Sequence, residues 1–189
     1  QYAGQLLLNF GHDYNKESYR RELDINNSIV ACSYSVGKTE YKKEYFANYP
    51  SNVIAIKITS SDKLDFSISF TSDMNGKVSL KESEIIYDGI TDSRKGIEGK
   101  LEYRVLTKII QNTGKIKADN ECLNVSEANS CIILMTVATN FIDYKTLGGD
   151  YKEKANRTIQ EAERKGYNKL KEEHIKDYRA IFDKVAIDL

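Results

Sequence analysis

Residues 30–47 read VACSYSVGKTEYKKEYFA, and this stretch decides the fold class. Apolar and polar side chains alternate through both of its halves, as they do in β-strands with one buried face and one solvated face. The dipeptide Gly37-Lys38 separates the two halves. Because glycine supplies the positive φ that the first position of a type II′ turn requires, the stretch predicts an antiparallel β-hairpin that turns at Gly37.

Further strand patterns lie on both sides of this hairpin, with no helical period between them. The segment 132–141 is apolar on both faces, which is typical of a strand that is covered on both sides. Turns are predicted at 49–52 and at Asn75-Gly76, and a loop at 88–100. The other predicted strands are 5–10, 19–25, 53–59, 64–71, 83–87, 101–110, 115–118 and 122–125. About ten short strands without intervening helices predict a mainly β fold, an antiparallel β-sandwich.

A helical tail is predicted from about Asp150 to the end of the chain. Residues 155, 159 and 162 are apolar and share one helix face, and Gly166 can end this first helix in a left-handed conformation. A second helix is predicted from Tyr167, with apolar side chains spaced by threes and fours along one stripe. The stripe comprises Tyr167, Leu170, His174, Tyr178, Ile181, Phe182 and Val185. We expect the stripe, including Phe182, to pack against the sheet, because an unsupported amphipathic helix is marginal in water. The alternative is that the stripe faces a part of the protein outside this chain and is exposed here.

Composition excludes several classes of protein. The 189 residues carry 28 Lys and Arg and 28 Asp and Glu, so no net charge favours nucleic acid or an anionic membrane. No apolar run approaches the roughly 20 residues of a membrane span, and no secretion signal is visible at Gln1. The expected partners therefore include neither nucleic acid nor membrane.

Motifs that carry chemistry are scarce. The segment VGKT at 36–39 is similar to the end of a phosphate-binding loop, but the glycine that the motif needs is Cys32 here, and strands flank it on both sides. His174 lies on the apolar stripe, where a hydrogen-bonded packing role is favoured, and His12 follows a strand in a polar loop. No spacing indicates a metal site, a nucleophile or a pair of catalytic carboxylates. We expect no cofactor.

Cysteine and tyrosine usage also favours a structural interpretation. Cys32, Cys122 and Cys131 lie within predicted strands without metal-binding spacing, so buried free thiols are favoured over a disulfide framework. The chain has 13 tyrosines and no tryptophan. Tyrosines on a sheet can stack on a sugar ring, but those at 34, 41 and 45 also suit cross-strand packing, which is favoured.

Five phrases of the sequence together carry a family resemblance. They are QYAGQLLLNFGH at 1–12, YRRELDI at 19–25, VGKTEYKKEYFANYPSNVIAIKIT at 36–59, ATNFIDY at 138–144 and HIKDYRAIFDKVAIDL at 174–189. In this order, they resemble the later part of the N-terminal β-sandwich domain of glycoside hydrolase family 95, the α-L-fucosidase family. The resemblance covers essentially the whole chain.

The resemblance implies a plan for the chain and for a longer parent protein. Residues 1–146 would form an antiparallel β-sandwich of the supersandwich type, whose first strands lie outside this chain. Residues 147–189 would form a helical linker that leads to an (α/α)6 catalytic barrel, also outside the chain. The implied partners are that barrel and, for the parent enzyme, a fucosylated glycan. The implied location is extracellular or on the surface of a bacterial cell.

The resemblance also implies that the chemistry of the parent lies elsewhere. The family's glutamic acid and its asparagine- and aspartate-activated water belong to the barrel, so no catalytic residue and no metal ligand is assigned here. Substrate-binding residues are unassigned, and loops such as 88–100 would have to supply any sugar contact. We expect the chain alone to be inactive.

Two alternatives stay open beside this non-catalytic domain. One is a stand-alone carbohydrate-binding module, and the other is the structural sandwich of a surface protein. The amphipathic tail favours the domain of a larger enzyme, because a free-standing module needs no long docking helix.

Overall fold

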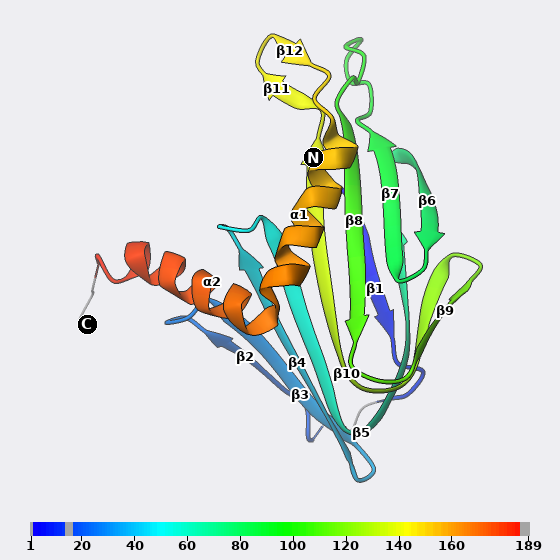
Figure 1. The fold of residues 1–189 in the computed structure, drawn as a ribbon, viewed down its shortest axis with the longest axis vertical. Helices are drawn as coiled ribbons and strands as arrows, with labels where there is room; N and C mark the ends of the chain where they lie inside the picture. The colour runs from blue at the N-terminus through cyan, green and yellow to red at the C-terminus, as the bar shows by residue number, and fades with distance from the viewer. Residues whose placement is uncertain (1, 14–16, 186–189) are drawn as a thin grey trace.

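The computed structural model describes residues 2–13 and 17–185, which form mostly strands with two helices at the C-terminal end (Figure 1). The helices are α1 (Tyr151–Lys165) and α2 (Tyr167–Phe182). The strands are β1 (Gln5–Asn9), β2 (Arg20–Asp24), β3 (Ile29–Val36), β4 (Thr39–Asn48), β5 (Val53–Thr71), β6 (Asn75–Lys81), β7 (Glu84–Ile90), β8 (Glu102–Gln111), β9 (Lys115–Asp119), β10 (Cys122–Thr139), β11 (Phe141–Asp143) and β12 (Thr146–Leu147).

Two long strands, β5 and β10, build the sandwich because each runs through both of its layers. One layer has the order β2-β3-β4-β5-β10-β8-β7-β6, while β1 pairs with the later part of β5 and β9 with the early part of β10. Register shifts interrupt the β5–β10 pairing between Val125 and Ser130, where Glu127 has a φ of 56°. Such bulges bend a strand, so one hydrogen-bonded sheet folds over itself into two layers. The predicted antiparallel β-sandwich is confirmed.

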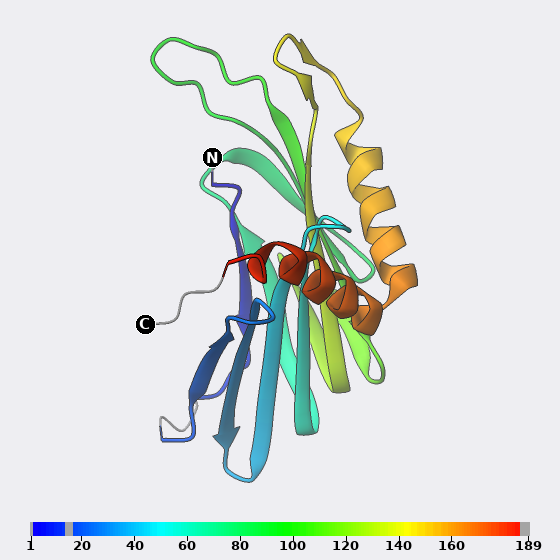
Figure 2. The same ribbon diagram turned by 90° about the vertical axis from the view of Figure 1, so that its left-hand side faces the viewer.

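The two faces of the large layer belong to different hydrophobic cores. Ile56 and Ile58 of β5 lie in the core between the layers, whereas Val53 and Ala55 lie in the core beneath the helices. Ile133 and Leu134, neighbours in β10, likewise enter opposite cores. Both faces of the central strands are therefore buried, which explains why the sequence of 132–141 is apolar on both faces. In Figure 2, α1 lies on one side of the sheet and β1 on the other.

Two strand boundaries differ from the prediction. The segments 53–59 and 64–71 belong to one strand, β5, and the segments 122–125 and 132–139 belong to one strand, β10, whereas Phe141 begins β11. The polar residues at 60–63 separate the two predicted strands, but in the structure they mark the bend at which β5 passes from one layer to the other.

The turn predicted at Asn75-Gly76 is wrong. Both residues lie in β6 and pair with Ile90 and Gly89 of β7. The ring of Tyr87 lies 2.5 Å from the position that a Cβ atom of Gly76 would occupy. Glycine is therefore required there because another side chain approaches the strand closely, and not because the chain turns.

The predicted hairpin and the two predicted helices are confirmed. Val36 pairs with Thr39, and Gly37 has a φ of 60°. The side chain of Asp150 caps α1 by accepting a hydrogen bond from the backbone N–H of Glu153 at 2.9 Å. Gly166 separates the helices with a φ of 75°. No helix in the described part of the chain is long and apolar enough to cross a membrane.

The apolar stripe of α2 is buried in its first half only. Tyr167, Leu170 and His174 are buried, but Ile181 is 71% exposed and Phe182 36% exposed. The C-terminal half of α2 extends away from the strands (Figure 1). The expected burial of Phe182 against the sheet is therefore wrong, because the protein beneath α2 ends before the helix does. The segment 186–189 at the end of the tail lies outside the described residues.

Candidate functional site

The first half of α2 is clamped to the sheet by buried polar contacts as well as by apolar packing. The side-chain amide of Asn48, at the end of β4, donates to the backbone carbonyl of Leu170 at 2.7 Å. The Nε2 atom of His174 lies 3.1 Å and 3.0 Å from the carbonyl oxygens of Asn27 and Ser28. Because both of these groups are acceptors, the ring donates from Nε2, and His174 is a packing residue as predicted.

A carboxylate in β4 forms the outer edge of the clamp. Glu44 accepts hydrogen bonds from the hydroxyl of Tyr167 and from the Nζ atom of Lys171, the second at 2.8 Å. Burial alone raises the pKa of Glu44, but the two hydrogen bonds outweigh burial and hold the pKa below its usual value. Burial and the Glu44 carboxylate raise the pKa of Tyr167, so its hydroxyl stays protonated and donates. We call this region the linker seat, with the residues Glu44, Asn48, Tyr167, Leu170, Lys171 and His174.

The turn between β2 and β3 supports α2 at one further point. The hydroxyl of Tyr178 donates to the carbonyl of Ile25 at 2.8 Å, and Nε of Arg179 donates to the carbonyl of Asn26 at 3.3 Å. The ring of Phe182 stacks on Tyr178 with centroids 5.0 Å apart. The helix therefore leaves the sheet one turn before it ends.

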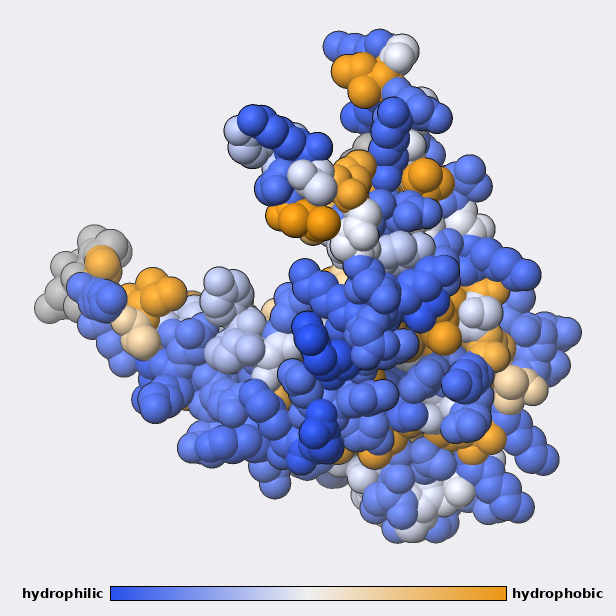
Figure 3. Space-filling view, turned by 45° about the horizontal axis from the view of Figure 1, so that its top comes forward, coloured by the Kyte–Doolittle hydropathy of each residue, from blue (hydrophilic) through white to orange (hydrophobic). Residues whose placement is uncertain are grey.

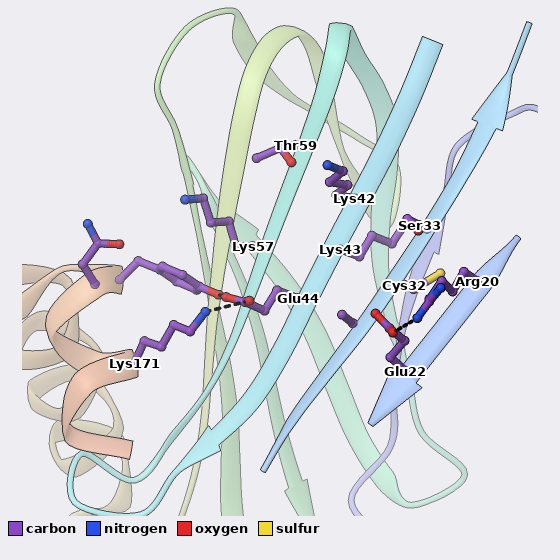
Figure 4. Close-up of a pocket in the computed structure, with 13 residues that line it drawn as sticks. Arg20, Glu22, Cys32, Ser33, Lys42, Lys43, Glu44, Lys57, Thr59 and Lys171 are labelled. Carbon is purple, nitrogen blue, oxygen red and sulfur yellow. Dashed lines mark hydrogen bonds and ion pairs between the residues drawn. The ribbon is translucent and has the colours of Figure 1, made fainter. Parts of the chain in front are cut away.

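A polar groove of about 560 Å³ lies beside the linker seat, over the outer face of β2 to β5 (Figure 4). Its two carboxylates are both in ion pairs, Glu22 with Arg20 and Glu44 with Lys171. The Nζ atom of Lys57 lies 5.2 Å from the ring centroid of Tyr167. Because both carboxylates are engaged in ion pairs, they do not form a pair in which one group could act as a catalytic acid and the other as a catalytic base. The pair of Glu44 with Lys171 instead helps to fix α2 on the sheet.

Exposed large apolar side chains gather at the far end of α2 and at the tips of two loops, as Figure 3 shows. These residues are Ile181 and Phe182 at the end of α2, Val185 just beyond it, and Ile97, Phe141, Ile142, Tyr144 and Leu147 on the loops. The predicted loop 88–100 contains one of these tips, although its first residues belong to β7.

The other residues singled out from the sequence take structural positions. His12 accepts or donates one hydrogen bond with the hydroxyl of Tyr34 at 3.2 Å, and Tyr34 stacks on Tyr41 with centroids 5.1 Å apart. The cross-strand packing predicted for these tyrosines is confirmed. The VGKT segment forms the turn of a hairpin and not the strand-to-helix turn of a phosphate-binding loop.

All three cysteines are free thiols. Cys131 is buried in the core between the layers, and its burial raises the pKa of the thiol to about 12. Cys32 and Cys122 are only partly buried. Among the described residues, no cluster of histidine, cysteine and carboxylate side chains could hold a metal ion.

The sequence analysis missed the residues of the linker seat that lie in β4. Glu44 and Tyr167 are 123 positions apart, and Asn48 and Leu170 are 122 positions apart, so no local pattern could pair them. One signal was available: Asn48 is a polar residue at a buried position of an alternating strand, and buried polar groups need a partner.

The known proteins to which this chain is similar include carbohydrate-active enzymes. The sequence profile of the family described as "Glycosyl hydrolase family 65, N-terminal domain" matches residues 1–144. The chain is 29% identical over 224 residues to "Alpha-L-fucosidase 2" of Arabidopsis thaliana, covering all of this chain and 26% of that protein. It is 24% identical over 204 residues to "Probable alpha-fucosidase A" of Aspergillus niger, covering all of this chain and 25% of that protein. The chain thus spans about a quarter of the length of these relatives.

A solved structure has the same fold. It is described as "Putative kojibiose phosphorylase from human microbiome" and matches with a TM-score of 0.62 at 10% identity. The match covers 94% of this chain and 27% of that one. At this identity the likeness concerns the fold alone, and it includes the helical tail as well as the sandwich.

Proposed function

Because this chain belongs to the family described as glycosyl hydrolase family 65, N-terminal domain, we propose that it is a non-catalytic domain of a fucosidase-like glycoside hydrolase. The matches to α-fucosidases over the whole chain support this assignment, and so does the resemblance to family 95. The parent enzyme would hydrolyse terminal α-L-fucosyl linkages in glycans. The role of this segment would be to hold and flank the catalytic barrel of the same polypeptide.

The observation that carries the proposal is the division of α2 into a clamped half and a projecting half. Buried hydrogen bonds fix Leu170 and His174 to the sheet, yet Ile181 and Val185 are each 71% exposed on the same stripe. An isolated amphipathic helix end of this kind is marginal in water unless another surface covers its apolar side. The catalytic barrel is the surface that the relatives' greater length suggests.

This proposal divides the chain into two functional parts. Residues 1–146 form the sandwich, and residues 147–189 form the linker that carries the barrel. The projecting loop tips with Phe141, Ile142 and Tyr144 are a second candidate contact with the barrel, because they are apolar and exposed. An extracellular or cell-surface location fits a parent enzyme that acts on glycans.

A stand-alone carbohydrate-binding module is the second candidate function. It is favoured by the aromatic side chains that gather between β1 and the inner face of β3 and β4, where Phe10, Tyr34 and Tyr41 lie together. A stand-alone module leaves the clamped helix without a role, so we place this candidate second.

The test compares two variants of the parent enzyme. Ile181→Asp puts a charge on the projecting stripe, whereas Lys184→Asp changes an exposed polar position on the same segment. We expect Ile181→Asp to lower the melting temperature and the fucosidase activity of the parent, and Lys184→Asp to leave both unchanged. Equal behaviour of the two variants would contradict docking through α2.

A second arm concerns the chain by itself. On a chromogenic α-L-fucoside, the purified chain should give no turnover, while the parent should be active. Activity that copurifies with the chain would overturn the non-catalytic assignment.

A further inference from the structure

A cleft of about 660 Å³ lies on the inner face of the sheet, the face opposite the helices. It arises because β1 is the last strand of the small layer, whereas the large layer continues beyond it with β4, β3 and β2. Leu8 and Phe10 form one wall, and Val30, Cys32 and Tyr45 are among the residues of the opposite wall. We call this space the inner cleft. Its volume suits a ligand of one or two sugar rings.

A half-buried lysine that forms no ion pair with a carboxylate of the described residues faces the inner cleft. Lys43 lies on the inner face of β4, directly opposite Cys32 of β3. Its Nζ atom lies 3.8 Å from the ring centroid of Phe10 and 5.1 Å from that of Tyr34. No carboxylate of the described residues lies within 4.0 Å of this nitrogen. Burial lowers the pKa of Lys43, because removing the ammonium from water disfavours its charged form.

The rest of the cleft has positive charge and aromatic surface. Arg21 of β2 lines the inner cleft, His12 lines it near its floor, and no aspartate or glutamate is among its lining residues in the described part of the chain. Three of the lining rings lie side by side: the ring centroid of His12 is 5.8 Å from that of Phe10 and 5.8 Å from that of Tyr34. Aromatic faces of this kind pack against the apolar face of a sugar ring.

The outer groove of Figure 4 makes a useful contrast. There, Glu22 and Glu44 each pair with a cation. Among the described residues that line the inner cleft, no such acid is present, and an unpaired charge that is partly removed from water is costly. A bound anion would compensate the Lys43 ammonium, with Arg21 in reach of the same cleft.

We propose that the inner cleft binds an anionic sugar, whose ring packs on the aromatic wall and whose negative group pairs with Lys43. The choice of a sugar rests on the proposed function, whereas the requirement for an anion rests on Lys43 and on the acid-free lining. The negative group can be a carboxylate or a sulfate ester, because both carry one negative charge with oxygen acceptors.

The experiment is a titration of the whole chain, followed by chemical-shift changes at low ionic strength and pH 7. The probes form a matched set: glucose, glucuronate and glucose 6-sulfate. We expect one or both anions to bind with a dissociation constant on the order of 1 mM, and glucose at least about tenfold more weakly. The anion that binds identifies the source of the charge. Equal binding of glucose, or no binding of either anion up to about 20 mM, would overturn the proposal.

A pair of neighbouring variants locates the site. Lys43→Met keeps the length of the side chain and removes the charge, so we expect it to weaken anion binding roughly tenfold or more. Lys42→Met is the control, because Lys42 is adjacent in β4, faces the opposite side of the strand and is not among the residues that line the inner cleft. Lys43→Arg should retain most of the binding. Equal loss in Lys42→Met and Lys43→Met would place the anion elsewhere and overturn the proposal.

This test is separable from that of the proposed function. Sugar binding is measured on the chain without its parent, so a failure of barrel docking leaves the titration unaffected. Conversely, loss of the inner-cleft proposal leaves the behaviour of Ile181→Asp in the parent enzyme unchanged.

Discussion

Truncating the stripe of α2 at two positions tests how far the helix is supported by the sheet. Leu170 has no exposed surface and lies in the core with Phe46 and Leu106 beneath the helices. Leu170→Ala removes buried carbon atoms and leaves a cavity, so it should lower the free energy of unfolding by about 2–5 kcal/mol. Phe182 is 36% exposed, and its ring stacks on Tyr178. Because such a stacked pair is worth about 0.5–1.5 kcal/mol, Phe182→Ala should cost about 0.5–1.5 kcal/mol, less than Leu170→Ala.

Urea unfolding of the isolated chain, followed by circular dichroism, measures both values. The midpoint should shift clearly for Leu170→Ala and only slightly for Phe182→Ala, with the slope of the transition unchanged in both. Phe182 is the larger side chain, so a prediction from residue size alone gives the opposite order. A loss for Phe182→Ala that equals or exceeds the loss for Leu170→Ala would refute the division of α2 into a clamped and a projecting half.

Three further outcomes follow from the same contacts. Hydrogen bonds hold the pKa of Glu44 below its usual value, so the carboxylate stabilises the fold above that usual value and loses this effect as pH falls through the lowered pKa. Glu44→Gln should therefore destabilise the chain in urea at pH 7, and the difference from the unsubstituted chain should shrink as the pH is lowered through the acid range. Gly166→Ala should cost about 1–3 kcal/mol in the same assay, since φ 75° with ψ 160° is strained for any residue with a Cβ atom. Burial raises the pKa of the Cys131 thiol to about 12, so iodoacetamide at pH 8 should label Cys131 only after the chain unfolds. Mass spectrometry of the digested chain measures the labelling, and labelling in the folded state would contradict the position of Cys131 in the core.

Local chemistry was sufficient where neighbours in sequence decide the structure. The hairpin at Gly37 follows from one glycine between two alternating strands, and the stripe of α1 follows from the spacing of Ala155, Ile159 and Ala162. Both were predicted because the turn and the helix face are properties of fewer than about 20 consecutive residues.

The predictions were wrong where the local structure depends on contacts with distant parts of the sequence. The bend in β5 depends on its pairing with β10, more than 60 positions away, so the polar residues 60–63 could not be distinguished from a turn. Gly76 was interpreted as a turn residue because the ring of Tyr87 that requires it was not visible in the local pattern. The stripe of α2 predicted an apolar face, but the point at which the sheet beneath it ends is a property of the whole fold.

The candidate sites were the least predictable part of the chain. Glu44 and Lys43 are consecutive residues with charged side chains, and the alternation of β4 says only that they face opposite sides. In the structure, Glu44 contacts Tyr167 and Lys171, whereas Lys43 contacts Phe10. These contacts depend on where α2 and β1 lie, which the alternation of β4 does not reveal. Sequence similarity supplied the family, and the structure supplied the contacts.

The most direct test of the central claim is amide hydrogen exchange along α2, measured in the isolated chain and in the parent enzyme. The account predicts that the segment 167–174 is protected in both, because the linker seat holds it. It predicts that the segment 181–185 exchanges rapidly in the isolated chain and becomes protected in the parent, where the barrel covers the exposed stripe. Equally rapid exchange of 181–185 in both proteins would contradict the claim that this chain is the domain that carries a catalytic barrel on α2.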